Sequence, residues 1–220
     1  MSREAGFSIH RNVFARERMA AVADALDSAT LARTKAGARN VMRVAEVRAI
    51  ADDEAMVAIA REFLGPSALP YRATLFDKSL EGNWLVSWHQ DTALPLRERR
   101  EAIGWGPWSI KGGVVHAIAP ASALEHVVAL RVHLDDSTLA NGPLRVLPGS
   151  HTSGILTDAQ IAKAVENSLP VDCIVDAGGV IAMRPLLLHA SSKSIGAQPR
   201  RVLHFEYSAT RMFDELELAF

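Results

Sequence analysis

Eight short segments between residues 70 and 208 alternate with turn residues, and this pattern constrains the fold more than any other feature of the chain. Each segment is rich in β-branched and aromatic residues, and Gly, Pro, Asn or Asp residues separate it from the next. The segments are YRATLFDK, NWLVSWHQ, GGVVHAIA, HVVALRVHL, GPLRVLP, VDCIV, GVIAM and RRVLHFEYS. We therefore expect about eight strands with long crossovers, which fit a double-sheet jelly roll.

Helical periodicity is concentrated in the first third of the chain. Apolar residues recur at helical spacing over residues 15–33, and residues 52–64 begin with acidic side chains and end before a Gly-Pro pair. A further short helix is expected at about residues 158–167. No repeat or linker divides the chain, so we expect residues 1–220 to form a single α+β, mainly β domain. In it, residues 1–69 would form a helical part packed on one sheet, and residues 70–208 would form the jelly-roll core.

The last segment, residues 200–208, has two faces of different chemistry, because neighbouring strand residues point to opposite sides of a sheet. One face is mainly apolar and contains Arg201, Leu203, Phe205 and Tyr207. The other face is more polar and contains Arg200, Val202, His204 and Glu206. The apolar face could pack under the N-terminal helices, while the polar face would line the inside of the barrel. A polar interior indicates a binding site.

The stretch WHQD at residues 88–91 is the most informative polar motif. On a strand, His89 and Asp91 would project to the same side. They would then supply two ligands of the 2-His-1-carboxylate triad, which holds Fe(II) and leaves positions open for substrate and oxygen. The motif is weak alone, because His133 and Asp135 repeat it. Taken alone, the plainer interpretation of either pair is a strand-end histidine followed by a turn aspartate.

Two distant residues strengthen the case for a metal site. His189 lies far downstream in RPLLLHASS, where we expect it to end an apolar strand with its side chain toward a cavity. Arg200 follows on the polar face of the last segment, and a guanidinium group can bind a carboxylate through two hydrogen bonds. Two histidines, one aspartate and one arginine would therefore meet from three strands.

These motifs resemble those of the phytanoyl-CoA dioxygenase family, which belongs to the Fe(II)- and 2-oxoglutarate-dependent oxygenases. The resemblance covers about residues 70–208. It rests on LFDKS at 75–79, WHQD at 88–91, HLDDSTLANGPLRVLPGSH at 133–151, and His189 followed by Arg200. The resemblance implies a cupin-like double-stranded β-helix. It also implies that the metal ligands lie elsewhere than at His133 and Asp135.

The resemblance further implies roles for individual residues. Fe(II) would be held by His89, Asp91 and His189, and Arg200 would bind the distal carboxylate of 2-oxoglutarate. Positions implied to assist at the cosubstrate are Ser191, Arg131 and Tyr71. The implied reaction uses O2 to hydroxylate a small organic molecule and releases succinate and carbon dioxide.

Residues 92–112 form a long stretch punctuated by Gly and Pro, and long loops beside a site are often lids. We therefore expect Trp105 or Trp108 to close over substrate, although core packing is the plainer interpretation of both. We expect the other conspicuous polar side chains to be ordinary surface or core residues without a role in the site. These are the histidines His10, His116, His126 and His204. Arg39, Asn40 and Arg43 could reach the site from outside the barrel, but a solvated loop after a helix is the plainer interpretation of this segment.

Composition limits the partners. The formal net charge is −1, which gives no reason to expect binding to nucleic acid or to an anionic membrane surface. No apolar run is long enough to span a bilayer, and the first residues lack the apolar segment of a secretory signal. The chain has a single cysteine, Cys173, so a reducing cytoplasm is the simplest location. The oligomeric state and the identity of the small-molecule substrate stay open.

Alternatives to a hydroxylase remain at this point. One is another metal-dependent cupin-type enzyme such as an isomerase, although most of those use more histidines and have no use for Arg200. The other is a non-catalytic jelly-roll binding domain. Acyl-CoA is not expected as substrate, because its phosphates call for a basic cluster and the compact candidates are only Arg97, Arg99 and Arg100.

Overall fold

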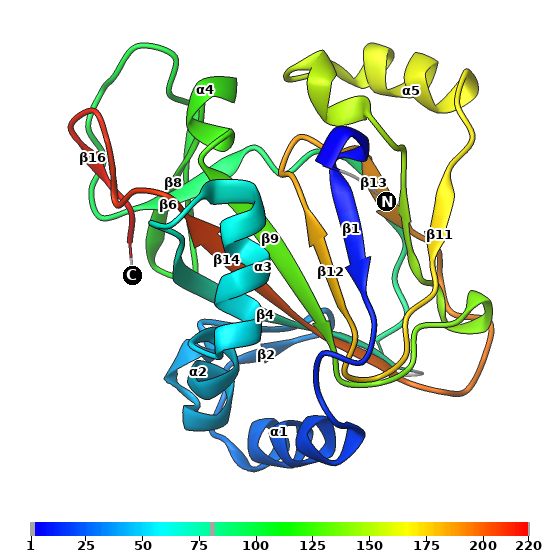
Figure 1. Cartoon of the computed structure of the whole chain (residues 1–220). Helices are drawn as coiled ribbons and strands as arrows, with labels where there is room; N and C mark the ends of the chain where they lie inside the picture. Colours follow the sequence, from blue (N-terminus) through cyan, green and yellow to red (C-terminus); the bar gives the residue numbers. More distant parts are fainter. Residues whose placement is uncertain (1–2, 80–81, 220) are drawn as a thin grey trace.

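The computed structural model describes residues 3–79 and 82–219, and its architecture is two β-sheets with helices packed on the outside (Figure 1). The larger sheet has seven strands in the order β1-β12-β9-β14-β4-β3-β2, and the smaller has four in the order β11-β10-β13-β5. Neighbouring strands in both sheets run antiparallel. This arrangement confirms the predicted jelly-roll class.

The larger sheet contains β1 (Phe7–His10), β2 (Arg33–Thr34), β3 (Gly37–Arg39), β4 (Leu69–Lys78), β9 (Val127–His133), β12 (Val180–Met183) and β14 (Arg200–Ser208). The smaller sheet contains β5 (Val86–His89), β10 (Leu144–Val146), β11 (Val171–Cys173) and β13 (His189–Ser191). A three-stranded sheet lies beside them, formed by β6 (Ala93–Leu96), β7 (Trp108–Lys111) and β8 (Val114–Ile118). A hairpin near the C-terminus pairs β15 (Met212–Phe213) with β16 (Leu216–Glu217).

The helices are α1 (Arg16–Ser28), α2 (Ala45–Ala51), α3 (Glu54–Leu64), α4 (Ala121–Leu124) and α5 (Asp158–Glu166). Helix α3 starts where the Asp53 carboxylate accepts a hydrogen bond from the amide of Ala55, and it ends at Gly65, which has a φ of 78°. Its apolar residues recur at helical spacing and are buried. None of the helices in residues 3–79 and 82–219 is long and apolar enough to cross a bilayer.

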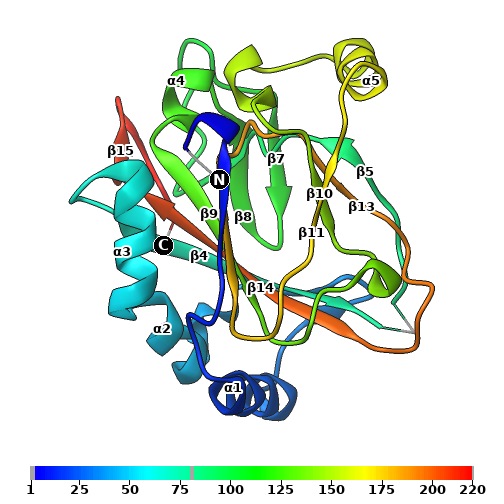
Figure 2. The same ribbon diagram turned by 45° about the vertical axis from the view of Figure 1, so that its right-hand side comes forward.

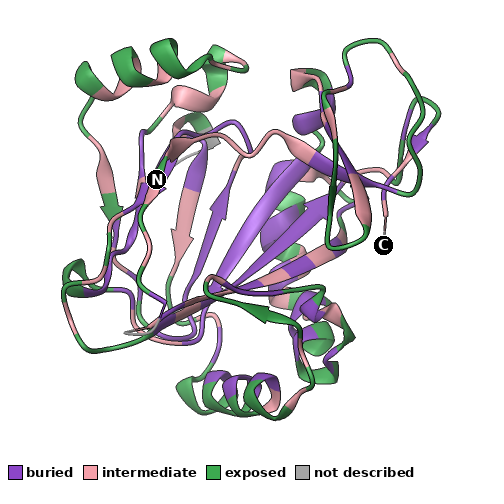
Figure 3. Cartoon of the chain, turned by 180° about the vertical axis from the view of Figure 1, so that it is seen from behind, coloured by how far each residue is buried: buried purple, intermediate pink, exposed green. Residues whose placement is uncertain are grey.

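Strand β14 lies in the centre of the larger sheet between β9 and β4, and its two faces follow the predicted division. Leu203, Phe205 and Tyr207 are fully buried in the core that also contains the apolar sides of α1, α2 and α3. The Tyr207 hydroxyl donates a hydrogen bond of 2.6 Å to the carbonyl of Ala51 in α2. Figure 2 shows these helices outside the sheet, and Figure 3 shows the buried central strands.

The N-terminal third is not wholly helical, which corrects part of the sequence-based prediction. Strand β1 pairs with β12, and the β2–β3 hairpin extends the sheet beyond β4. The helix expected at residues 15–33 ends at Ser28, and α2 is an additional helix. Two- to four-residue strands carry little local pattern, because their stability comes from pairing with distant strands rather than from their own sequence.

The interpretation of residues 92–112 as one long loop is also wrong. Strands β6 and β7 occupy its two ends, and both pair with β8. His189 begins β13 rather than ending an apolar strand, because the preceding leucines lie in a turn. Both differences arise where tertiary pairing, not local propensity, decides the conformation.

Candidate metal centre and cosubstrate pocket

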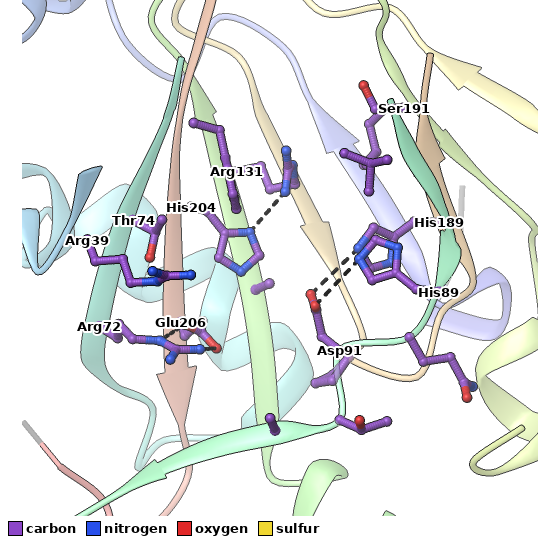
Figure 4. A pocket seen from close by; sticks show the side chains of 18 of the residues that line it. Arg39, Arg72, Thr74, His89, Asp91, Arg131, His189, Ser191, His204 and Glu206 are labelled. Atoms are coloured by element: carbon purple, nitrogen blue, oxygen red, sulfur yellow. Dashed lines mark hydrogen bonds and ion pairs between the residues drawn. The ribbon is translucent and has the colours of Figure 1, made fainter. Parts of the chain in front are cut away.

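A cavity of about 400 Å³ opens between the two sheets, and side chains from β4, β5, β9, β13 and β14 line it. Figure 4 shows one wall formed by residues of the larger sheet, including Arg72, Thr74 and Glu206. On the opposite side lie His89, Asp91 and His189. A polar cavity inside the barrel is therefore present where the face analysis of residues 200–208 predicted it.

Three candidate metal ligands converge at this cavity. His89 ends β5 and His189 begins β13, and the two are directly paired across these antiparallel strands, with ring centroids 4.1 Å apart. Asp91 lies just beyond β5, where its backbone amide donates a hydrogen bond of 2.9 Å to the carbonyl of Pro185. One ligand atom from each residue lies within 4.8 Å of the other two.

The imidazole rings are held with their Nε2 atoms toward Asp91. His89 Nδ1 lies 2.8 Å from the carbonyl oxygen of Ser87, and His189 Nδ1 lies 2.9 Å from that of Leu187. A carbonyl can only accept, so each Nδ1 donates and each Nε2 is left facing Asp91. The His89 Nε2 atom lies 3.9 Å and the His189 Nε2 atom 3.6 Å from Asp91 oxygens. This orientation by backbone carbonyls is typical of metal-binding histidines.

The electrostatic environment keeps these groups in the protonation states that a metal requires. Burial raises the pKa of Asp91, but the neighbouring His189, His204, His89 and Arg131 outweigh it and lower the pKa to about 2. Burial lowers the pKa of His189 to about 4, against the opposing effect of Asp91. The carboxylate is therefore ionised and His189 neutral at physiological pH, which is the donor chemistry of a ferrous site.

A second polar group lies deeper, around the Ser191 hydroxyl. This hydroxyl donates to the carbonyl of Gly142 at 2.8 Å and accepts from Lys78 Nζ at 2.8 Å and from an Arg200 terminal nitrogen at 3.1 Å. All the hydrogen-bonding capacity of the hydroxyl is then used. Ser191 thus holds two buried cations side by side rather than offering a free donor to a ligand.

Arg200 retains donor capacity directed away from these contacts. Its Nε donates to the carbonyl of Asn141 at 3.3 Å, while one terminal nitrogen is buried without a hydrogen-bond partner in the described structure. Burial, followed by the nearby Arg131, lowers the pKa of Arg200 to about 10, so the side chain stays charged at neutral pH. A buried, charged and partly unsatisfied guanidinium is suited to an anionic partner.

The Asn141-Gly142 turn explains the most specific sequence motif. Gly142 has a φ of 68°, and a Cβ at this position would lie 2.2 Å from the carbonyl oxygen of Ser192. Glycine therefore permits both the turn and the close approach of the segment after β13. The turn's two carbonyls accept from Arg200 and Ser191, so the motif positions these two side chains in the cavity.

Arg131 and His204 line the same cavity as the candidate metal ligands and the polar group around Ser191. The Arg131 guanidinium donates to His204 Nδ1 at 3.0 Å, which leaves His204 neutral with its proton on Nε2. Burial, followed by Arg131, lowers the pKa of His204 to about 4, and burial lowers that of Arg131 to about 10. The Arg131 Nε atom is buried and has no hydrogen-bond partner among the described residues.

The wall opposite the metal ligands contains an ion-pair network. Arg72 forms a bidentate pair with Glu206, and the Tyr71 hydroxyl donates to the same carboxylate at 3.2 Å. A further Arg72 nitrogen lies 2.9 Å from Nε2 of His116. The other ring nitrogen of His116, Nδ1, lies 3.0 Å from the carbonyl oxygen of Val114. The Glu206 carboxylate thus accepts three hydrogen bonds, one from Tyr71 and two from Arg72, and these bonds fix this wall of the cavity.

The structure brings together most of the predicted site residues. Lining the cavity are His89, Asp91, Arg131, His189, Ser191 and Arg200. Tyr71 is not part of the lining and acts on it through Glu206. Trp105 and Trp108 pack in or against a separate apolar cluster with Leu124 and Phe213 and do not line the cavity, so their lid role stays a prediction.

The rival pair His133 and Asp135 does not form a site in the described structure. His133 is fully buried and neither ring nitrogen has a hydrogen-bond partner among the described residues. Asp135 instead binds Arg201, with two hydrogen bonds of 2.9 Å from the guanidinium. The two residues are separated because β9 ends at His133, so Asp135 lies in the bend that follows and turns toward Arg201.

Several lining residues were missed or given plainer roles from the sequence. These are Arg39, Arg72, Lys78, Lys111 and His116, together with His204, which the sequence placed on the polar face but not in a site. Alternation would have found Arg72 and Lys78, since Arg72, Thr74, Phe76 and Lys78 occupy one face of β4. Arg39 lines the cavity and not merely a solvated loop, because the β2–β3 hairpin carries it to the edge of β4.

Comparisons with known proteins agree with this architecture. The sequence profile described as phytanoyl-CoA dioxygenase matches residues 2–202. L-proline trans-4-hydroxylase of Streptomyces griseoviridis is 26% identical over 180 residues, which are 70% of this chain but 59% of that protein. The chain thus spans less than two thirds of the length of this curated relative.

Solved structures show the same fold at low sequence identity. AviO1 from Streptomyces viridochromogenes Tue57 superposes with a TM-score of 0.68 and 22% identity, covering 99% of this chain and 94% of that one. HygX from Streptomyces hygroscopicus, solved with nickel and 2-oxoglutarate bound, has a TM-score of 0.67 and 17% identity. That match covers 94% of this chain and 84% of HygX.

Proposed function

The chain belongs to the phytanoyl-CoA dioxygenase family, and on this premise we propose that it is an Fe(II)- and 2-oxoglutarate-dependent dioxygenase that hydroxylates a small organic molecule. The observation that carries the proposal is the meeting of His89, Asp91 and His189 beside the buried, partly unpartnered Arg200. Neither group alone would specify this chemistry. Together they provide a metal site and a site for a dicarboxylate.

The donor set fits a ferrous ion. Two neutral imidazoles and one carboxylate form a 2-His-1-carboxylate triad, which suits Fe(II) and leaves further coordination positions open. The protein's ligand atoms lie within 4.8 Å of one another, and the two backbone carbonyls hold the rings in the required tautomer. When bound, iron with 2-oxoglutarate and O2 supplies oxidation of an unactivated C–H bond, with succinate and carbon dioxide as coproducts.

The chain's own residues would position the cosubstrate and the substrate. We assign Arg200 and Lys78 to the distal carboxylate of 2-oxoglutarate, with Ser191 holding both cations in place. Arg131, charged and buried near Asp91 and His204, adds positive potential on the path between this carboxylate and the metal ligands. The cavity's position between the two sheets would limit bulk water at the reacting centre, where such exclusion strengthens every charged contact.

The direct test uses protein loaded anaerobically with Fe(II) and titrated with 2-oxoglutarate. A visible charge-transfer band is expected on binding, and succinate is expected once O2 and a substrate are admitted. Arg200→Ala should abolish the band or weaken cosubstrate binding, because a buried carboxylate would lose its charged partner.

The same titration separates the alternatives. A metal-dependent isomerase of similar fold would give no band with 2-oxoglutarate. A non-catalytic binding domain would give a band only if it kept both ligand sets, and it would release no succinate after oxygen is admitted. Absence of both the band and succinate would contradict the proposed function.

A further inference from the structure

The cavity contains more positive charge than the metal and cosubstrate sites require. Among the described residues that line it, six are cationic and two are carboxylates. The cations are Arg39, Arg72, Lys78, Lys111, Arg131 and Arg200, and the carboxylates are Asp91 and Glu206. A ferrous ion and dianionic 2-oxoglutarate would cancel each other's charge, so the excess would persist in the loaded enzyme.

The buried cations have contacts that account for them. Arg72 is neutralised by Glu206, and Arg200 and Lys78 are held together at the proposed cosubstrate subsite. Arg131 binds His204 and lies near Asp91, whose negative charge acts on it. The lining cations without such contacts are Arg39 and Lys111, which lie nearer the solvent.

Arg39 is the better placed of these two. It occupies β3, where its register partner is Thr74 in β4, it is exposed, and among the described residues its side chain has no hydrogen-bond or ion-pair partner. Figure 4 shows its guanidinium extending into the cavity near Thr74 and above Arg72, across from the metal ligands. A second cavity of about 260 Å³ adjoins the first, and Arg39 lines both.

We propose that Arg39 binds a carboxylate of the primary substrate, so that the enzyme hydroxylates small carboxylic acids. This inference rests on the proposed oxygenase function and specifies its substrate class. A guanidinium group presents two parallel donors that match a carboxylate, and the backbone of β3 places the Arg39 side chain at the cavity. Arg39 would hold the acid at the mouth, and the rest of the molecule would extend toward His89, Asp91 and His189.

The size of the site and its charges favour a small acid over a coenzyme A thioester. The cavity of about 400 Å³ has to accommodate 2-oxoglutarate as well as the substrate. The basic cluster near the C-terminal hairpin is already paired, Arg97 with Glu217, Arg99 with Glu101 and Arg100 with Glu215. Several phosphates would therefore find few unpaired cations, whereas one carboxylate finds Arg39 with Lys111 nearby.

The test compares acids with their uncharged amides. Protein loaded with Ni(II) and 2-oxoglutarate is titrated calorimetrically with L-proline, benzoate and hexanoate, and with L-prolinamide, benzamide and hexanamide. At least one acid should bind more tightly than its amide. Arg39→Gln should weaken binding of that acid roughly tenfold or more and leave amide binding unchanged, because a charge-assisted hydrogen bond is lost.

Arg61→Gln is the matched control, since Arg61 is exposed on α3 and remote from the cavity lining. With Fe(II) and O2, Arg39→Gln should raise the KM for the bound acid more than it lowers kcat. Amides that bind as tightly as acids, acids that bind equally to wild type and Arg39→Gln, or no acid binding would each overturn the proposal. A separate titration of the Ni(II)-loaded protein with 2-oxoglutarate reports on the oxygenase assignment, whose failure would show as no 2-oxoglutarate binding.

Discussion

His89 and His189 are directly opposite one another on the antiparallel strands β5 and β13, with their rings 4.1 Å apart. Each ring is oriented by the carbonyl two residues before it. The strand register, rather than any local motif, therefore creates the pair of imidazole donors. Asp91 completes the set from the turn after β5, where Pro185 holds its backbone.

Removing one of these histidines should abolish tight metal binding. His189→Ala is expected to lower the affinity for Fe(II) or Ni(II) by more than about a hundredfold. Removing a residue that only hydrogen-bonds to a metal ligand already lowers metal affinity by about 10–100-fold, and removing a ligand should lower it further. His126→Ala is the control, since His126 is exposed and does not line the cavity. Calorimetric titration of the metal measures both. Equal affinities in the two variants would exclude this metal site.

Arg200 and Arg201 provide a matched pair, since they are adjacent and point to opposite faces of β14. Arg200→Gln should weaken 2-oxoglutarate binding roughly tenfold to a hundredfold, with little effect on metal binding. Arg201→Gln should instead reduce the free energy of unfolding by about 1 kcal/mol, because it breaks the two-bond pair with Asp135. Cosubstrate titration and urea denaturation of both variants check the separation. If Arg201→Gln impaired binding as much as Arg200→Gln, the assignment of Arg200 would fail.

Gly142 tests the turn that supports Ser191 and Arg200. Gly142→Ala should destabilise the protein and weaken 2-oxoglutarate binding, because its Cβ would lie 2.2 Å from the Ser192 carbonyl oxygen. Gly149→Ala is a control of similar backbone strain, with a φ of 80° and no atom within 4 Å of the added Cβ. The control should cost roughly 1–2 kcal/mol and spare binding. Thermal denaturation and cosubstrate titration distinguish steric displacement from conformational strain alone.

Lys78 should make stability depend on pH. Burial, followed by the charges of Arg200 and Arg131, lowers the pKa of Lys78 from 10.5 to about 8. Between these values the unfolded chain binds more protons than the folded one, so the free energy of unfolding rises with pH. The gain in the free energy of unfolding that comes from deprotonating Lys78 is complete above about pH 10.5 and is lost as pH falls through about 8.

Urea denaturation of the metal-free protein across this range measures the effect. Relative to Lys78→Met, wild type should gain up to about 3 kcal/mol between pH 8 and pH 10.5. Lys163→Met, at an exposed position in α5, should keep the wild-type profile. A Lys78→Met profile parallel to that of wild type would show that Lys78 titrates normally.

The parts of this protein that follow from the sequence are those set by strand alternation. The two faces of β14 were predictable, because Leu203, Phe205 and Tyr207 alternate with Arg200, His204 and Glu206. The same reasoning applied to β4 would have placed Lys78 in the cavity. The strand that carries Arg39 was not predictable, because β2 and β3 together contain only five residues and their pairing with β4 depends on distant partners.

The network on the wall opposite the metal ligands should be strongly coupled. Glu206→Gln is expected to reduce the free energy of unfolding by about 3 kcal/mol, because it leaves the Arg72 guanidinium without its charged partner in a largely buried position. Replacing both residues, in Arg72→Met with Glu206→Gln, should cost less than the sum of the single changes. The exposed pair Arg145–Asp172 provides a control, since Asp172→Asn should cost less than about 1 kcal/mol. A double-mutant cycle measured by urea denaturation gives the coupling, and a coupling near zero would mean that Arg72 is solvated rather than dependent on Glu206.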